Sequence, residues 1–127
     1  MTLKDKLLMV ANYVRMKVEH ENKKDNPKLY GTCVDASLEI KDMLEDIGID
    51  AEFIEGWVSY DISSNCSDRS YDEHCWVEVK ENDATWYVDV TATQFNAFVC
   101  NEFEPVIVST VKPNQMLYYD PSIDDEP

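Results

Sequence analysis

The spacing of apolar residues changes once along this chain, from a helical repeat before Gly48 to a strand-like pattern after Ala51. The N-terminal segment carries one apolar stripe at helical spacing, which predicts an amphipathic helix over residues 3–20 with Thr2 placed to cap it. The stripe is formed by Leu7, Val10, Ala11, Val14 and Val18. Helical patterns followed by strand patterns predict an α+β fold.

A second helix is predicted over residues 32–47. Thr32 is a candidate N-cap, Asp35 lies in the first turn where the helix dipole favours an acid, and Gly48 suits a left-handed C-terminal cap. One face of this helix carries Cys33, Ser37, Ile40 and Leu44. That face is expected to pack inward, so the thiol of Cys33 should point toward the layer beneath the helix.

Strand patterns occupy most of the remaining chain. They cover residues 51–60, 73–79 and 85–91, with further candidates at 105–110 and 116–119. Residues 21–28, between the two helices, and 61–72, between the first two strands, are predicted to be loops. Residues 80–83 are predicted to form a hairpin turn between the second and third strands. We therefore expect N-terminal helices, one of them bearing Cys33, packed on an antiparallel sheet.

Length and composition bound the class of protein. A chain of 127 residues with 44% hydrophobic residues suits one folded domain without a separate cofactor domain. We assign residues 1–119 to that domain and 120–127, with four acidic residues and two prolines, to a C-terminal tail. No apolar run approaches the roughly 18 residues of a membrane span, and the N-terminus lacks a secretory signal pattern. A cytoplasmic location is expected.

The net charge of −15 argues against nucleic-acid binding, because neutralising phosphates requires clustered Lys and Arg. It is compatible with a basic protein or peptide partner, or simply with solubility. The four cysteines form no C-x-x-C pair and are expected to be free thiols in a reducing cytosol. A bridge between Cys66 and Cys75 is the alternative if the protein is exported.

A thiol, an imidazole and a carboxylate follow one another on three separate predicted elements. Cys33 begins the second helix, His74 begins a strand, and Asp89 interrupts the otherwise apolar strand pattern that follows. These are the groups that cysteine-based acyl transfer requires: a nucleophile, a general base and an orienting acid. A helix N-terminus and a nearby imidazolium both lower the pKa of a thiol.

Each of these residues also has a purely structural interpretation. Cys33 would be a small buried hydrophobe, His74 an ordinary edge-strand histidine, and Asp89 an exposed position on a half-solvated face. The hairpin register distinguishes the interpretations in part. If the numbers of paired residues add to an odd value, His74 and Asp89 share a face of the sheet; an even value separates them. Sequence does not fix this register.

Three blocks surround these residues: GTCxDxS at 31–37, HCWVEV at 74–79 and WYVDVTATQF at 86–95. Together they resemble the transglutaminase-like superfamily of papain-fold cysteine enzymes, which includes transglutaminases, bacterial peptidases and leader-peptide proteases. The resemblance implies a papain-like fold with Cys33 as nucleophile, His74 as general base and then acid, and Asp89 as orienting carboxylate. It also implies an oxyanion hole that includes the Cys33 backbone N–H.

This chain departs from the family pattern at three positions. Val90 replaces the common proline after the aspartate, Cys75 replaces the common alanine after the histidine, and Pro27 stands near where papain-like members place a glutamine. The second oxyanion donor is therefore unassigned. Its candidates are Asn26 and Tyr30, followed by Gln94.

A zinc site formed by Cys66, His74, Cys75 and Cys100 is a competing use of these residues. Adjacent residues of a strand point to opposite faces, so His74 and Cys75 cannot easily bind one ion. We therefore predict no metal. We also predict no cofactor, since no phosphate-binding glycine-rich loop is present.

Two functional hypotheses follow. The first is a cysteine hydrolase or acyltransferase acting on an amide of a peptide or protein substrate through a thioacyl intermediate, with hydrolysis preferred. The second is a catalytically inactive papain-like module whose acidic surface docks a basic protein.

Overall fold

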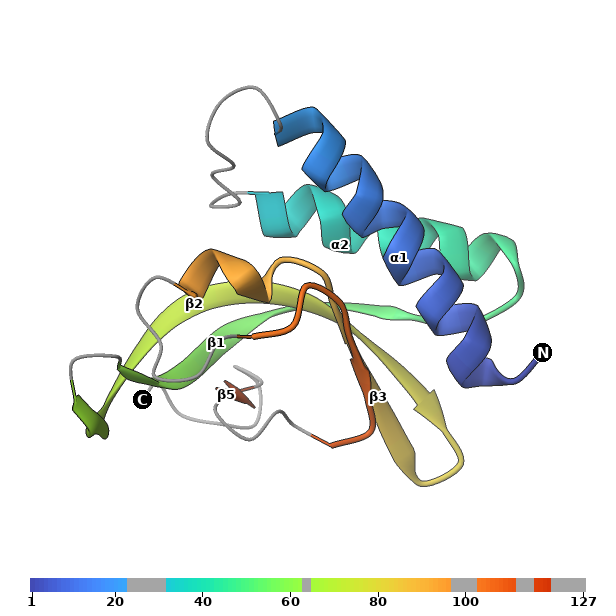
Figure 1. Ribbon diagram of the computed structural model, residues 1–127. Coiled ribbons are helices and arrows are strands. Elements are labelled where there is room, and N and C mark those ends of the chain that lie inside the picture. Colours follow the sequence, from blue (N-terminus) through green and yellow to red (C-terminus); the bar gives the residue numbers. More distant parts are fainter. Residues whose placement is uncertain (23–31, 63–64, 97–102, 112–115, 120–127) are drawn as a thin grey trace.

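The computed structural model shows an α+β protein in which two helices pack on an antiparallel sheet (Figure 1). It describes residues 1–22, 32–62, 65–96, 103–111 and 116–119, without the side chains of some strand residues. The predicted loop 21–28, apart from its first two residues, and the predicted tail 120–127 lie outside the described residues. Within the described ranges, neither helix combines the length and apolar character needed to cross a membrane.

The helices form where the apolar stripes predicted them. Helix α1 spans Leu3–Asn22, and Thr2 and Asp5 cap its start reciprocally, with each side chain accepting the other's backbone N–H. Helix α2 spans Thr32–Asp46 and is followed by Gly48 at φ +85°, the left-handed conformation expected after a helix. The residues of both predicted inward faces are buried, except Cys33, which is half-buried.

In the described part of the chain, five strands form one sheet in the spatial order β4-β3-β2-β1-β5. Their bounds are β1 Glu52–Ile62, β2 Asn65–Glu81, β3 Ala84–Asp89, β4 Ile107–Ser109 and β5 Met116–Tyr119. A short 3₁₀ helix, η1 (Ala92–Phe95), follows β3. The last strand coincides with its prediction, and the others agree in type with shifted ends.

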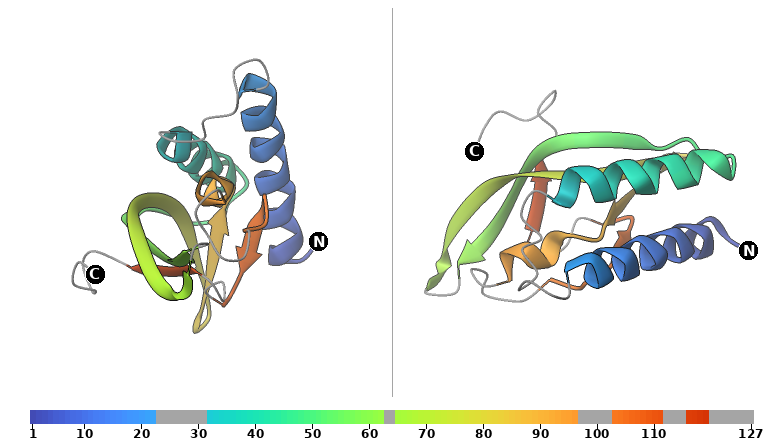
Figure 2. Two further views of the ribbon diagram at one scale, coloured as in Figure 1. Left: turned by 60° about the vertical axis from the view of Figure 1, so that its left-hand side comes forward. Right: turned by 90° about the horizontal axis from the view of Figure 1, so that it is seen from above.

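The predicted loop at 61–72 is wrong. Strands β1 and β2 pair through most of this stretch, from Val58 with Asp72 to Asp61 with Arg69, with one irregularity at Ile62. Polar composition alone indicated a loop, but strand pairing continues outward along the hairpin once its apolar half has fixed the register. The result is a long ribbon that extends beyond the part of the sheet beneath the helices (Figure 2).

The hairpin from β2 to β3 turns at Asn82, which has φ 55°, the left-handed conformation that asparagine tolerates. Val77 pairs with Val88, so the numbers of paired residues add to an odd value. Continuing this register by one residue places Trp76 opposite Asp89. His74 therefore lies on the same face as Asp89, displaced diagonally by two residues rather than directly opposite.

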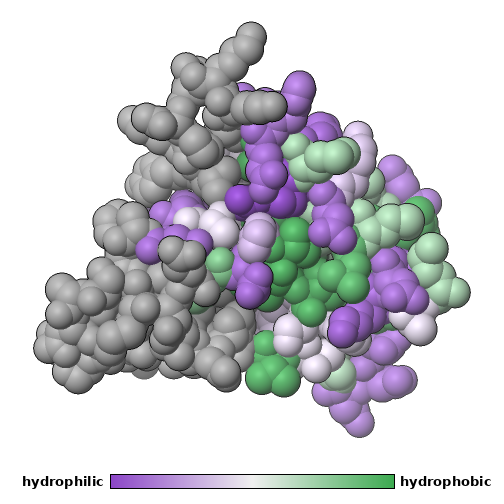
Figure 3. All heavy atoms as spheres, viewed as in Figure 1, coloured by the Kyte–Doolittle hydropathy of each residue, from purple (hydrophilic) through white to green (hydrophobic). Residues whose placement is uncertain are grey.

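The two faces of the sheet have separate cores. The helices bury one face, where Val77, Val79 and Val88 contact the apolar stripes of α1 and α2. On the other face, Trp76 packs with Val58 of β1 and with Ala92, Phe103 and Ile107, which follow β3. In a space-filling view, polar side chains cover much of the described surface, and apolar ones gather in the middle of the face shown (Figure 3).

Candidate active site

The site lies where β2 continues beyond the end of β3. The ladder between these strands stops at Val77 and Val88, whereas β2 continues to pair with β1 at His74 and Cys75. Strand β3 ends at Asp89, and the chain turns through Thr91 into η1. This leaves one side of β2 available to the first turn of α2 and to the residues that follow β3.

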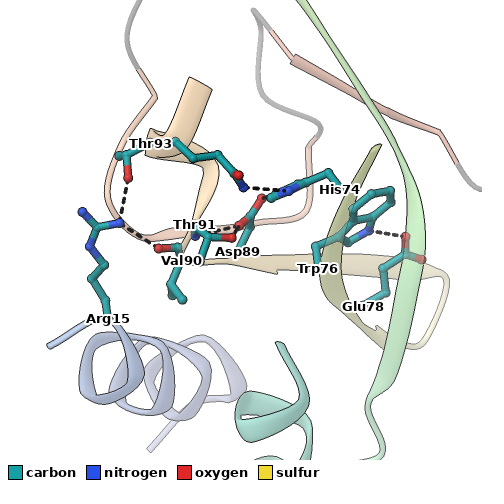
Figure 4. Close-up of polar contacts among 9 residues, drawn as sticks. Arg15, His74, Trp76, Glu78, Asp89, Val90, Thr91 and Thr93 are labelled. Atoms are coloured by element: carbon teal, nitrogen blue, oxygen red, sulfur yellow. Dashed lines mark hydrogen bonds and ion pairs between the residues drawn. The ribbon is translucent and has the colours of Figure 1, made fainter. Parts of the chain in front are cut away.

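His74 and Asp89 are in direct contact. Nε2 of His74 lies 2.7 Å from Oδ2 of Asp89, and the exposed fractions of the two side chains are 0% and 1% (Figure 4). A carboxylate only accepts hydrogen bonds, so it selects the tautomer that carries its proton on Nε2. The other carboxylate oxygen of Asp89 accepts hydrogen bonds from the backbone N–H and the hydroxyl of Thr91.

The pKa of His74 is raised to about 9. Burial lowers it, but the charge of Asp89, the hydrogen bond to that carboxylate and the contact with Cys33 together outweigh burial. The imidazole is therefore held as an imidazolium at neutral pH. Trp76 lies beside it on the same face, with ring centroids 6.1 Å apart, and donates its indole N–H to Glu78.

The thiol of Cys33 interacts with His74. Burial raises the pKa of this thiol, but the hydrogen bond to His74, the imidazolium charge and a hydrogen bond from the Cys75 backbone N–H lower it below its ordinary value. Since Nε2 is bound to Asp89, the contact with sulfur falls to Nδ1. Sulfur, imidazole and carboxylate thus lie in sequence, and the imidazole is not turned away from the thiol.

Two further residues touch this group. The side-chain nitrogen of Gln94, in η1, lies 3.2 Å from Nδ1 of His74. The thiol of Cys75 contacts that of Cys33; burial and the neighbouring thiolate raise the pKa of Cys75 to about 12. Cys33 and Cys75 are both free thiols.

The sequence patterns do not predict these two contacts. Gln94 is the last of the three candidates for an oxyanion donor, and the other two, Asn26 and Tyr30, lie outside the described residues. The contact of Cys75 had a usable signal: strand alternation places Cys75 on the face of Val77 and Val79, which the helices cover.

The described residues contain no group of three His, Cys, Asp or Glu side chains that could hold a metal ion. Of the four residues considered for zinc, Cys100 and the side chain of Cys66 lie outside the described part of the chain.

Comparison with known proteins yields little. No family model matches the chain, and no curated protein matches it. A solved structure of the C-terminal region of Pasteurella multocida toxin, described as revealing a thiol-protease like catalytic triad, matches with a TM-score of 0.41 and 18% identity. The match covers 85% of this chain and 17% of that one. A likeness of this size assigns no activity, and the transglutaminase-like resemblance stays a prediction.

Proposed function

We propose that this protein is a cysteine hydrolase or acyltransferase that acts on an amide bond of a peptide or protein, with Cys33, His74 and Asp89 as its catalytic residues. The observation that carries the proposal is the contact between a thiol of lowered pKa and a buried imidazolium that a carboxylate holds at 2.7 Å. Perturbed titratable groups arranged in this order are typical of cysteine nucleophiles.

The first half of the reaction follows from this geometry. The Cys33 thiolate attacks the amide carbonyl, forming a carbon–sulfur bond and a tetrahedral oxyanion. The carbon–nitrogen bond then breaks, and the imidazolium of His74 gives its Nδ1 proton to the departing amine. Asp89 keeps the ring oriented and stabilises its charged form throughout.

The second half restores the enzyme. His74, now neutral, takes a proton from a water molecule as the water oxygen attacks the thioester, and the acid and free thiolate are released. Hydrolysis is preferred over transfer to an amine because a domain of this size has little structure with which to exclude water. The Cys33 backbone N–H lies in the first turn of α2, where it has no intrahelical partner and can face the oxyanion.

The test uses p-nitrophenyl acetate as an acyl donor. We expect a burst of p-nitrophenolate, an acetyl group on Cys33 by peptide mass mapping, and slow turnover. Cys33→Ala should lose the burst, and His74→Gln should lose turnover. Acceleration by added glycine methyl ester would identify an acyltransferase. Acetylation that falls equally on Cys75, or none on Cys33, would contradict the proposal.

The net charge of −15 favours the second candidate, an inactive module that docks a basic protein. Such a module requires no activated thiol, so an ordinary pKa for Cys33 would support it. Its binding should also weaken as the salt concentration is raised, because screening shortens the range of electrostatic attraction. Binding of a basic peptide such as polylysine that is independent of salt would remove charge as the basis of docking.

A further inference from the structure

Arg15 of α1 reaches across to the turn that follows β3. Its side chain is only 14% exposed. One guanidinium nitrogen, Nη1, donates to the backbone carbonyl of Val90 at 2.8 Å and to the hydroxyl of Thr93 at 2.7 Å (Figure 4). Nε pairs with Glu19 on the same helix at 2.8 Å. Charge-assisted hydrogen bonds of this kind are stronger than neutral ones, and the fixed guanidinium geometry makes them directional.

The two acceptors lie between the two residues that contact the imidazole of His74, each next to one of them in the sequence. Val90 directly follows Asp89, which contacts Nε2 of His74. Thr93 directly precedes Gln94, whose side chain lies against Nδ1 of the same ring. Nη1 of Arg15 therefore binds one residue next to Asp89 and one residue next to Gln94. Asp89 and Gln94 in turn contact the two nitrogens of the His74 ring.

We propose that Arg15 is a positioning residue for the candidate active site: by binding Val90 and Thr93 it fixes Asp89 and Gln94 on opposite sides of the His74 imidazole. The proposal rests on the function proposed above for that site. Arg15 touches none of the three catalytic residues and acts only through the turn.

A positioning role and a general electrostatic role predict opposite changes in the pKa of His74. The groups that raise this pKa are Asp89 of β3 and Cys33 of α2. Removing the positive charge of Arg15, and leaving Glu19 without its partner, can only raise the pKa or leave it unchanged. Loosening the turn weakens the hydrogen bond between His74 and Asp89, and this lowers the pKa.

The experiment measures the pKa of His74 by NMR titration of the imidazole, with His20→Gln to assign the two histidines. We expect Arg15→Gln to lower the pKa by about one unit, equivalent to the loss of roughly one good hydrogen bond. Arg15→Lys should recover part of the shift, because a lysine can keep one of the two acceptors. Lys17→Met is the matched control, because it removes a cation of α1 that pairs with Glu39 of α2. This variant should leave the pKa of His74 unchanged.

A pKa that is unchanged or raised in folded Arg15→Gln overturns the proposal. If this variant does not fold, Thr93→Val decides, since it removes one acceptor and nearly preserves shape: a lowered pKa supports the proposal and an unchanged one overturns it. The titration requires no turnover. Failure of Cys33 to accept an acetyl group would therefore count against the proposed function alone.

Discussion

The Asp89 carboxylate lies 2.7 Å from Nε2 of His74, and neither side chain has appreciable contact with solvent. A buried carboxylate is costly unless it is paired and hydrogen-bonded, and Asp89 meets this need with His74 and Thr91. The pairing leaves Nδ1 as the only ring nitrogen available to sulfur. The charge of Asp89 on β3 therefore affects the nucleophilicity of the Cys33 thiol on α2 through the imidazole.

Replacing Asp89 by Asn should make Cys33 less reactive. Without the carboxylate charge the pKa of His74 falls and the imidazolium is lost. The thiol pKa of Cys33 then rises, because only the contacts with Cys75 are left to oppose burial. We expect alkylation of Cys33 by iodoacetamide at about pH 7 to slow by roughly tenfold or more. Glu78→Gln is the control, since that carboxylate binds Trp76 and should leave the rate unchanged. Equal alkylation rates in wild type and Asp89→Asn would show that the Asp89 carboxylate does not affect the reactivity of the Cys33 thiol.

Stability should depend on pH through His74. Its pKa in the folded protein, about 9, exceeds the ordinary 6.5, so its contribution is complete below 6.5 and is lost as pH rises toward 9. In Cys33→Ser, whose hydroxyl does not titrate here, the free energy of unfolding should fall across this window by at most roughly 3 kcal/mol. Urea unfolding at stepped pH measures the change. Adding His74→Gln should flatten the profile, and a rise with pH would be inconsistent with a raised pKa.

Gln94→Ala should impair turnover with little effect on stability. The variant removes the Gln94 amide, whose N–H can donate to Nδ1 of His74 when the imidazole is neutral, as it is when water attacks the thioester. We expect the rate of p-nitrophenyl acetate turnover to fall by roughly five- to tenfold, as the loss of about 1 kcal/mol of ring orientation requires. The urea midpoint should stay near that of wild type. A turnover rate equal to wild type would show that Asp89 alone orients the ring.

The inward face of α2 should carry most of the stability of that helix. Leu44 is fully buried, and Leu38 on the same helix is 41% exposed. Leu44→Ala should destabilise the fold by about 2–5 kcal/mol, whereas Leu38→Ala should cost roughly 0.5 kcal/mol or less. Urea unfolding of the two variants tests this difference. Similar losses in both would mean that the assigned face of α2 is wrong.

Much of this fold could be predicted from the sequence because periodic burial of apolar residues, such as Val14 and Ile40, leaves a local pattern. The strand character of 61–72 could not, because that pairing depends on a register fixed elsewhere in the hairpin. The order of thiol, imidazole and acid along the chain indicated the candidate site. The hydrogen bonds of Arg15 to Val90 and Thr93 left no sequence signal. These partners are separated from Arg15 by 75 and 78 positions in the sequence and meet it only in the folded chain.

The most direct test of the proposed active site is the rate of alkylation of Cys33 as a function of pH, followed by mass spectrometry with Cys75 in the same molecule as reference. We predict that Cys33 reacts with an apparent pKa below the ordinary value of about 8.5, while Cys75, with a pKa raised to about 12, stays unmodified. Two thiols that titrate alike near the ordinary value would contradict it.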